Sequence, residues 1–268
     1  MSDRIRHIRF RFVAPNGVMA ISFALILLTL EFSAQINLKD SSVVAPMICS
    51  SYSFQIPGAD MAKRFGVNSA VGLQFLLKSK KNWIYGIGGD FMFGNTVNEN
   101  GILDSIKTSD GFLIAVNGKL VDSRLLERGF SAGFKFGKLF PVFAPNRNSG
   151  IVAIAGIGFI QHKIRIELID GTNEITPQLN DEMKKGYDRL TNGISLSQSL
   201  GYLHLSNNRI TNFYAGIEIT EGFTKNRRSF DYDLMKKDER LRTDLLYGIR
   251  IGWILPLYKR APKEFYTN

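Results

Sequence analysis

Histidine, serine and carboxylate side chains are the residue types in this chain that could together perform acyl transfer or hydrolysis. In such a site the histidine takes the proton of the serine nucleophile and the carboxylate orients the histidine. Beyond the first 34 of the 268 residues the histidines are His162 and His204. Pairing of their segments would place His162 opposite about Leu196 and leave His204 many residues away along the strand. Because neither histidine has a serine and an acid within reach, we predict a protein that is not an enzyme and needs no cofactor.

Cysteine chemistry is limited in the same way. Cys49 is the single cysteine, which excludes an intramolecular disulfide and a cysteine-based zinc site. We therefore expect no metal centre, and the remaining chemistry is that of charged groups.

A line of polar residues crosses the segment GIVAIAGIGFIQHKIRIELIDG, residues 150 to 171. Gln161, Lys163, Arg165 and Glu167 occupy every second position, and apolar residues fill most of the positions between them. Successive side chains of a strand point to opposite faces, so this spacing predicts a strand with one polar and one apolar face.

The same alternation recurs along the chain, and its polar face consists of small residues. In GISLSQSLGYLHLS, residues 193 to 206, Ile194, Leu196 and Leu200 alternate with serine and glycine. A soluble β-sandwich is the alternative fold, but the polar face of its strands would carry larger side chains suited to contact with water. Here the polar face is rich in glycine and serine, while the apolar face is bulky and often aromatic. We expect the bulky residues to face lipid and the small or charged residues to fill a narrow interior.

Eight alternating segments predict the architecture. They are 45–56, 66–78, 83–95, 128–140, 151–168, 192–206, 212–224 and 241–257. Short connections at 79–82, 142–150 and 206–209 alternate with long ones at 96–127, 169–191 and 225–240, as do the periplasmic turns and outer loops of bacterial membrane barrels. The sequence thus predicts an all-β fold over 35–268: an eight-stranded antiparallel up-and-down transmembrane β-barrel with three long extracellular loops and both termini in the periplasm.

The N-terminal segment has the order of a secretory signal. Four arginines between Arg4 and Arg11 precede an apolar run from Val18 to Leu30, and FSAQ offers cleavage after Ala34. An uncleaved anchor is the alternative, although the run is shorter than the ~20 residues that a spanning helix needs. We expect a cleaved signal peptide, 1–34, and a mature protein in the outer membrane of a Gram-negative bacterium.

Charged residues of the strands are predicted to point into the barrel. They are Asp90, Lys135, Lys163, Arg165, Glu167, Glu218, Asp244 and Arg250. An isolated buried ion costs several kcal/mol, so these charges need partners. An eight-stranded barrel has room for its own side chains or one small ligand. We expect a closed core held by paired charges, with an ion path as the alternative.

Other polar residues are candidates for outward contacts. His162 and Gln198 interrupt the predicted lipid face and are candidates for contact with a partner protein. Arg227, Arg228, Lys236 and Lys237 lie in the last long loop, where cations could hold phosphate groups of outer-membrane lipid, although a solvated loop is the simpler alternative. The apolar stretch DGFLIAVNGKLV within 96–127 is expected to form its own hairpin or to dock on a partner. Nucleic acid is not an expected partner despite the net charge of +10, because the cations do not line one face or helix.

Several stretches also resemble a known group of proteins. The signal ending in SAQ, the glycine-rich strands, GYDRLTNGISLSQSLGYLHLSNNR, RRSFDYD and the closing LLYGIRIGWILPLYKRAPKEFY resemble small outer-membrane barrels of Bacteroidota, the group that includes PorT-like proteins. The resemblance implies an accessory subunit of a larger outer-membrane complex for protein secretion or barrel assembly. The alternatives are a small barrel that binds or passes an apolar or lipid ligand and, third, a lipid-modifying enzyme.

Overall fold

The computed structural model describes residues 42–99, 101–169, 176–206 and 210–257. The expected signal peptide, 1–34, lies outside these residues. The elements are β1 (Ala45–Gly58), α2 (Ala59–Ala62), β2 (Asn68–Lys78), β3 (Trp83–Gly94), η1 (Asp104–Ile106), β4 (Leu113–Ile114), β5 (Leu120–Phe140), β6 (Gly150–Ile169), η2 (Pro177–Leu179), η3 (Met183–Gly186), β7 (Thr191–His204), β8 (Phe213–Asn226) and β9 (Leu241–Pro256). Within the described ranges no helix is long and apolar enough to cross a membrane.

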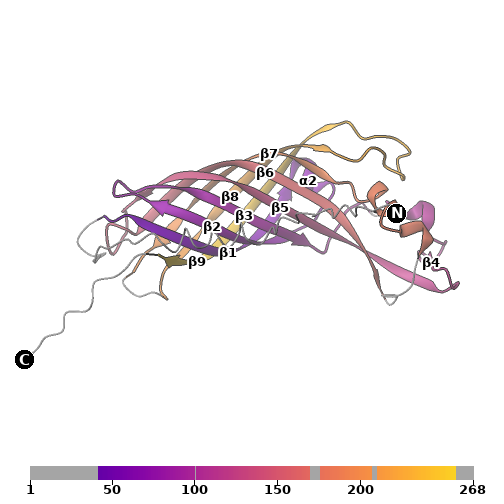
Figure 1. The fold of residues 1–268 in the computed structure, drawn as a ribbon, viewed down its shortest axis with the longest axis horizontal. Coiled ribbons are helices and arrows are strands. Elements are labelled where there is room, and N and C mark those ends of the chain that lie inside the picture. Colours follow the sequence, from indigo (N-terminus) through magenta and orange to yellow (C-terminus); the bar gives the residue numbers. More distant parts are fainter. Residues whose placement is uncertain (1–41, 100, 170–175, 207–209, 258–268) are drawn as a thin grey trace, which may run out of the picture.

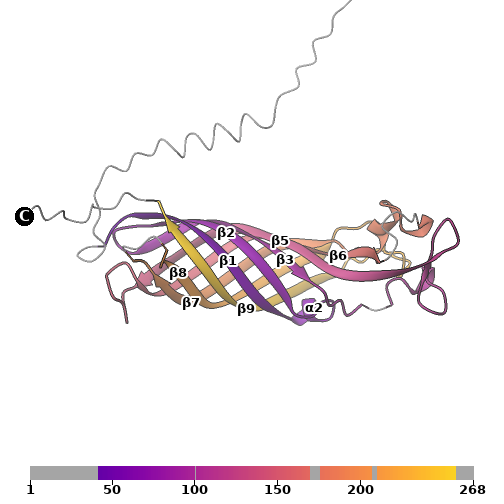
Figure 2. The same cartoon turned by 90° about the horizontal axis from the view of Figure 1, so that it is seen from below.

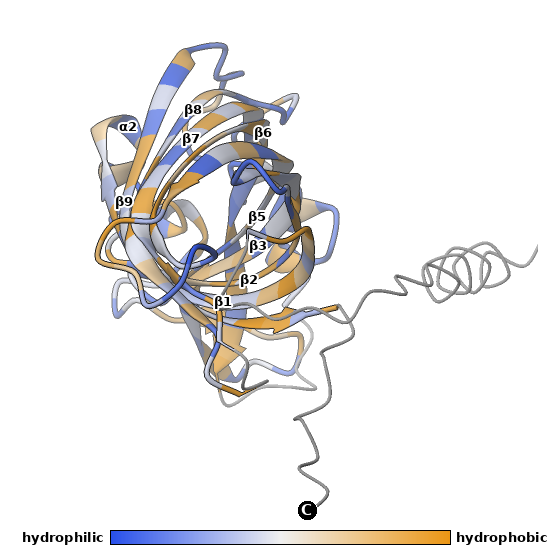
Figure 3. Cartoon of the chain, turned by 90° about the vertical axis from the view of Figure 1, so that its left-hand side faces the viewer, coloured by the Kyte–Doolittle hydropathy of each residue, from blue (hydrophilic) through white to orange (hydrophobic). Residues whose placement is uncertain are grey.

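Eight of the strands close into one antiparallel barrel. The ring runs β1, β2, β3, β5, β6, β7, β8 and β9, and β9 returns to pair with β1 from Met47↔Pro256 to Gly58↔Leu245. β3 pairs with β5 from Trp83↔Lys138 to Gly94↔Glu127, while the two-residue β4 adds to the far end of β5. Figure 3 looks along the barrel and shows the closed ring. The predicted eight-stranded antiparallel fold is confirmed.

The two ends of the barrel differ in the length of their connections. We call the end with the turns after β2, β5 and β7 the short-turn end, and the opposite end, with α2 and the long connections, the loop end. β5 and β6 are 21 and 20 residues long, far more than the ~9–11 that cross a bilayer, and their hairpin extends beyond the ring at the loop end (Figures 1 and 2). Residues 120–127, expected in a loop, therefore belong to β5. The expected hairpin in 96–127 is present, because β4 pairs with Leu120 and Val121.

Exposed apolar side chains on all eight strands form a belt around the outside of the ring. Its exposed side chains include Tyr52, Phe54, Val71, Leu73, Tyr85, Ile87, Phe91, Phe130, Phe134, Ile157, Ile194, Leu200, Ile217, Tyr247, Ile249 and Ile251. At the short-turn end the belt borders on aromatic residues with polar contacts. Trp253 donates from its ring nitrogen to the carbonyl of Ile210 at 3.0 Å, and Tyr202 donates to the carbonyl of Phe143 at 2.9 Å. A closed ring with an apolar exterior and interfacial aromatics is the form in which strands span a membrane.

The faces of the second half of β6 are opposite to our prediction. Ile160, Ile164 and Ile166 point inward and are buried, so Gln161, Lys163, Arg165 and Glu167 point outward. The strand keeps one alternation throughout, but its surroundings change. Between Ile151 and Phe159 the outward side chains include Ile157 and belong to the apolar belt. The pairing of β6 with β7 ends at His162, so the residues after it extend beyond the ring, where we expect water outside. There the polar residues face outward, and Ile164 and Ile166 pack on the inner face with buried apolar residues of the long connections, such as Leu179.

Two buried apolar clusters fill the interior near the ends of the barrel. The cluster at the short-turn end includes Met47, Leu76, Ile84, Leu139 and Ile254. The cluster at the loop end includes Met61, Phe65, Met92, Ile160 and Leu246. Along β9 the inward positions between Leu246 and Ile254 are Gly248, Arg250 and Gly252. The polar section of the lumen therefore lies between two apolar plugs.

Candidate functional site: lumen charges and loop-end cavity

Four of the predicted lumen charges meet in the middle of the barrel. Arg250 contacts Asp90 from Nη1 at 2.6 Å and Glu218 from Nε at 2.5 Å. Lys135 lies 3.5 Å from the other oxygen of Glu218, and Ser51 accepts from Arg250 at 2.8 Å. The two cations and two carboxylates balance, as buried charges require.

Gly72 on β2 makes the room for this network, because it lies in register between Ser51 on β1 and Asp90 on β3. A Cβ atom at Gly72 would lie 2.0 Å from an oxygen of Asp90 and 2.8 Å from the hydroxyl of Ser51. Any side chain at this position would displace the carboxylate from Arg250. The small residues of the inner face thus serve close packing of charges rather than an open channel.

Little space remains between the lumen side chains. Two cavities of about 30 and 20 Å³ lie beside Lys135 and Glu218, enough for one or two water molecules. At the short-turn end the buried ammonium of Lys78 donates to Asn148 at 2.9 Å and to the carbonyl of Val43 at 3.1 Å. Sequence reasoning missed Lys78, because its acceptors come from a distant turn and from the segment before β1.

His162 lies inside the barrel, so the prediction that it faces outward and contacts a partner protein is wrong. It is buried, and its Nε2 atom is 2.9 Å from Oδ2 of Asp244, which also accepts from the hydroxyl of Thr224 at 2.5 Å. Its register partner is Thr191 and not a residue near Leu196. Asp244 is therefore an inward charge as predicted, but its partner is His162. Thr224 and His162 both contact the carboxylate of Asp244, so the histidine is not placed to take the proton of the threonine hydroxyl.

Three other predicted charges do not enter the lumen. Arg165 and Glu167 form an ion pair of 2.8 Å on the outer face of the β5–β6 hairpin, and Lys163 points outward beside them. An exposed pair of this kind contributes at most about 1 kcal/mol. The cause is the change from lipid to water along β6 described above.

The long connections are held together by two reciprocal ion pairs. Asp188 accepts from Arg228 through both oxygens, at 2.7 and 2.5 Å. The next residue, Arg189, contacts Asp231 at 3.3 Å and Asp233 at 2.5 Å, and it also pairs with Glu99. We call Asp188, Arg189, Arg228, Asp231 and Asp233 the clasp. It joins the segment before β7 to the segment after β8.

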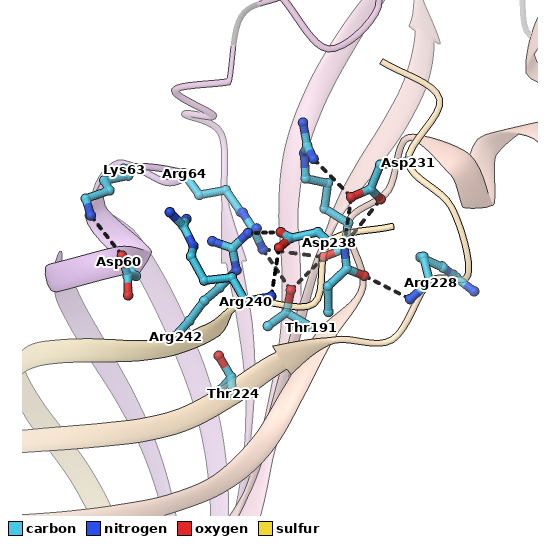
Figure 4. Close-up of polar contacts among 12 residues, drawn as sticks. Asp60, Lys63, Arg64, Thr191, Thr224, Arg228, Asp231, Asp238, Arg240 and Arg242 are labelled. Carbon is cyan, nitrogen blue, oxygen red and sulfur yellow. Dashed lines mark hydrogen bonds and ion pairs between the residues drawn. The ribbon is translucent and has the colours of Figure 1, made fainter. Parts of the chain in front are cut away.

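The four predicted surface-lipid residues have different surroundings, and of these residues only Arg228 belongs to the clasp. Arg228 donates to the carboxylate of Asp188, and Arg227 donates to the side-chain oxygen of Asn192 at 2.6 Å. Lys236 and Lys237 line a cavity of about 500 Å³ at the loop end together with Arg64, Arg240 and Arg242. Figure 4 labels these three arginines. Arg64 follows α2, whereas the other four lie together within 236–242, so no sequence spacing predicts that Arg64 meets them.

Gln198 is placed as predicted, exposed on the outer face of β7. It lies in a groove of about 630 Å³ with Ala153 and Ala155 as small residues and Trp83 and Phe136 among its larger ones. The groove runs across the outside of β3, β5, β6, β7 and β8. A polar amide therefore interrupts the lipid-facing belt at a hollow.

A bound metal ion requires several ligand side chains grouped around it. In the described part of the chain, no three His, Cys, Asp or Glu side chains are arranged to hold a metal ion.

No protein family matches this sequence, and no curated protein does. Several solved structures are similar to the chain at low identity, among them the following three. Ail, the attachment invasion locus protein of Yersinia pestis, is 11% identical with a TM-score of 0.38, over 80% of this chain and 99% of that one. Neisserial surface protein A is 9% identical with a TM-score of 0.36, over 78% and 96%. The outer membrane protein OprG of Pseudomonas aeruginosa is 11% identical with a TM-score of 0.34, over 82% and 99%. No function follows from these similarities.

Proposed function

We propose that this protein lies in the outer membrane of a Gram-negative bacterium with both termini in the periplasm. The apolar belt and the closed ring support this location, because such barrels leave no strand edge exposed to lipid. β1 begins and β9 ends at the short-turn end, where Met47 pairs with Pro256. Short turns of bacterial outer-membrane barrels lie in the periplasm.

The proposed role is that of a non-enzymatic accessory or structural subunit of an envelope complex for protein secretion or outer-membrane protein assembly. The filled lumen is the observation that carries this proposal. The described cavities beside Lys135 and Glu218 are only about 30 and 20 Å³, which favours the outer surface as the functional surface. Passage of a ligand has less support for the same reason, and it would give long-lived conductance steps in planar bilayers.

The groove around Gln198 is the proposed contact surface, and its proposed occupant is the strand face of a larger outer-membrane barrel. An amide group in hydrocarbon is costly unless it forms a hydrogen bond. Small residues such as Ala153 and Ala155 allow another protein surface to approach closely, as small residues do between membrane helices. A polar group of the partner would then pair with Gln198.

Purification in mild detergent from cells tests the role. Stoichiometric partners are expected with the wild type and reduced recovery with Gln198→Leu, whose stability in lipid should not fall. Tyr52→Leu is the matched control, because it also removes a polar group from the exposed face but lies on β1, across the barrel. Wild-type protein that brings no partner, or a Gln198→Leu variant that brings the same amounts, would contradict the proposal.

A further inference from the structure

The loop-end cavity has an excess of positive charge. It lies between α2, the segment 234–240 and the start of β9, and Figure 4 shows part of its polar lining. Seven basic and four acidic residues line it, which leaves an excess of three positive charges. At about 500 Å³ it is within the size range of small-molecule sites.

The acidic residues of the cavity already have partners within the protein. Asp60 pairs with Lys63 at 2.8 Å, and Glu239 pairs with Lys237 at 2.7 Å. Asp238 pairs with Arg242, and Glu99 pairs with both Arg64 and Arg189. Arg189 is also paired with Asp231 and Asp233 of the clasp, which lie outside the lining. Among the described residues, Lys236 and Arg240 are the lining cations that form no ion pair with a carboxylate.

Two buried guanidinium groups keep donors that no described residue accepts. Arg64 is 3% exposed, and it donates to Glu99 and to Thr191 at 2.8 Å each, but its Nη2 atom has no acceptor among the described residues. Arg242 is 9% exposed and pairs with Asp238, while its Nε atom likewise has no acceptor there. Unsatisfied buried donors are costly, so an acceptor from outside the protein would stabilise this arrangement.

The charges of these two residues also act on each other. Burial lowers the pKa of Arg64, and the positive charges of Arg242 and Arg189 lower it further, although Glu99 raises it. An arginine stays charged in proteins, so the repulsion persists. A bound anion would relieve it.

A tetrahedral oxyanion fits these donors best. Guanidinium groups bind phosphate with directed, charge-assisted hydrogen bonds, and lysines add point charge. The cavity is larger than one phosphate ion and has room for an attached sugar. We propose that it binds a phosphate monoester on a sugar-sized group, with Arg64 and Arg242 as buried donors and the exposed Lys236 and Arg240 as cations at the rim.

This phosphate could belong to a sugar phosphate in solution or to the headgroup of a phosphorylated glycolipid. Calorimetry of the purified protein in zwitterionic nanodiscs, with glucose 6-phosphate as probe and glucose as the uncharged control, tests the first source. Retention of bisphosphorylated lipid A, compared with dephosphorylated lipid A, in native mass spectrometry tests the second. Binding in either arm supports the site, and the arm that responds identifies the source.

The variants separate the site from general attraction of anions. Arg64→Gln should weaken binding about tenfold, the loss of one charge-assisted hydrogen bond. The double variant Lys236→Gln/Arg240→Gln changes exposed residues and should weaken binding without a change in folding. Folding is monitored by the change in gel mobility when the sample is heated. Arg124→Gln removes a cation from the exposed face of the β5–β6 hairpin, away from the cavity, and should leave binding unchanged. No binding by the wild type in either arm, or equal losses in the Arg124 and cavity variants, would overturn the proposal.

Discussion

Arg250 and Glu218 form an ion pair of 2.5 Å across two adjacent strands in the middle of the barrel, with Asp90 on the other side of the guanidinium. Replacing Arg250 with methionine would leave two carboxylates buried without their main partner. Removal of one member of a buried pair costs about 3 kcal/mol or more. We expect Arg250→Met to lower the free energy of unfolding by this amount in urea titrations followed by the fluorescence of Trp83 and Trp253.

The exposed Arg165 provides the matched control for that experiment. It pairs with Glu167 on the outer face of the hairpin, where an ion pair is worth at most about 1 kcal/mol. Arg165→Met should therefore unfold close to the wild type. Equal destabilisation by the two variants would contradict the placement of one cation in the lumen and the other in water.

Ile217 tests the apolar belt. It is exposed near the middle of β8, and Ile217→Arg should cost ~2–4 kcal/mol if this position lies at the bilayer midplane. Val116 is 70% exposed in the turn between β4 and β5, beyond the ring, so Val116→Arg makes a similar chemical change in water. Unfolding in lipid should separate the two variants, and the same loss in both would exclude a lipid environment for Ile217.

The alternation along the chain predicted the eight strands well, because the period of two persists wherever a strand has a lipid face and an inner face. It also predicted Asp90, Lys135, Glu218 and Arg250 as inward partners. The prediction was wrong for Lys163, Arg165 and Glu167, because the surroundings of β6 change from lipid to water while the alternation does not. Arg64, Arg189 and Arg242 could not be predicted, since their contacts depend on how long connections fold over one another.

The clasp gives a prediction about the segment 229–240. Arg189 holds Asp231 and Asp233, so Arg189→Gln should release this segment while the barrel stays folded. Trypsin should then cut faster after Lys236, Lys237 and Arg240. Arg227→Gln removes a neighbouring cation that donates to Asn192, and its cleavage rate should stay near that of the wild type. An unchanged rate for Arg189→Gln would mean that the clasp does not hold the segment.

Asp60 gives a pH dependence at the loop end. The hydrogen bond from Lys63 lowers its pKa, and the bond from the backbone N–H of Thr243 lowers it further. A carboxyl group with a lowered folded pKa stabilises the fold above its unfolded value of about 3.9, and this contribution is lost as the pH falls through the folded pKa. Protection of the Thr243 amide from hydrogen exchange should therefore fall below about pH 4. In Asp60→Asn the protection should be weaker and should not change over that range; the same fall in that variant would exclude Asp60 as the cause.

The sidedness of the barrel can be tested at two exposed positions on opposite ends. Met235 is 75% exposed in the segment between β8 and β9, and Phe143 is 88% exposed in the turn after β5. If the short turns are periplasmic, a protease site inserted after Met235 should be cut on intact cells, because that segment faces the medium. A site inserted after Phe143 should be cut only after the outer membrane is permeabilised. Neither insertion touches the ion pairs of the lumen. The insertion after Met235 lengthens the turn that the Asp231 N–H closes on the Lys236 carbonyl, so folding of both variants is checked by gel mobility. Cutting of intact cells at Phe143 but not at Met235 would reverse the proposed orientation and would place the loop-end cavity in the periplasm.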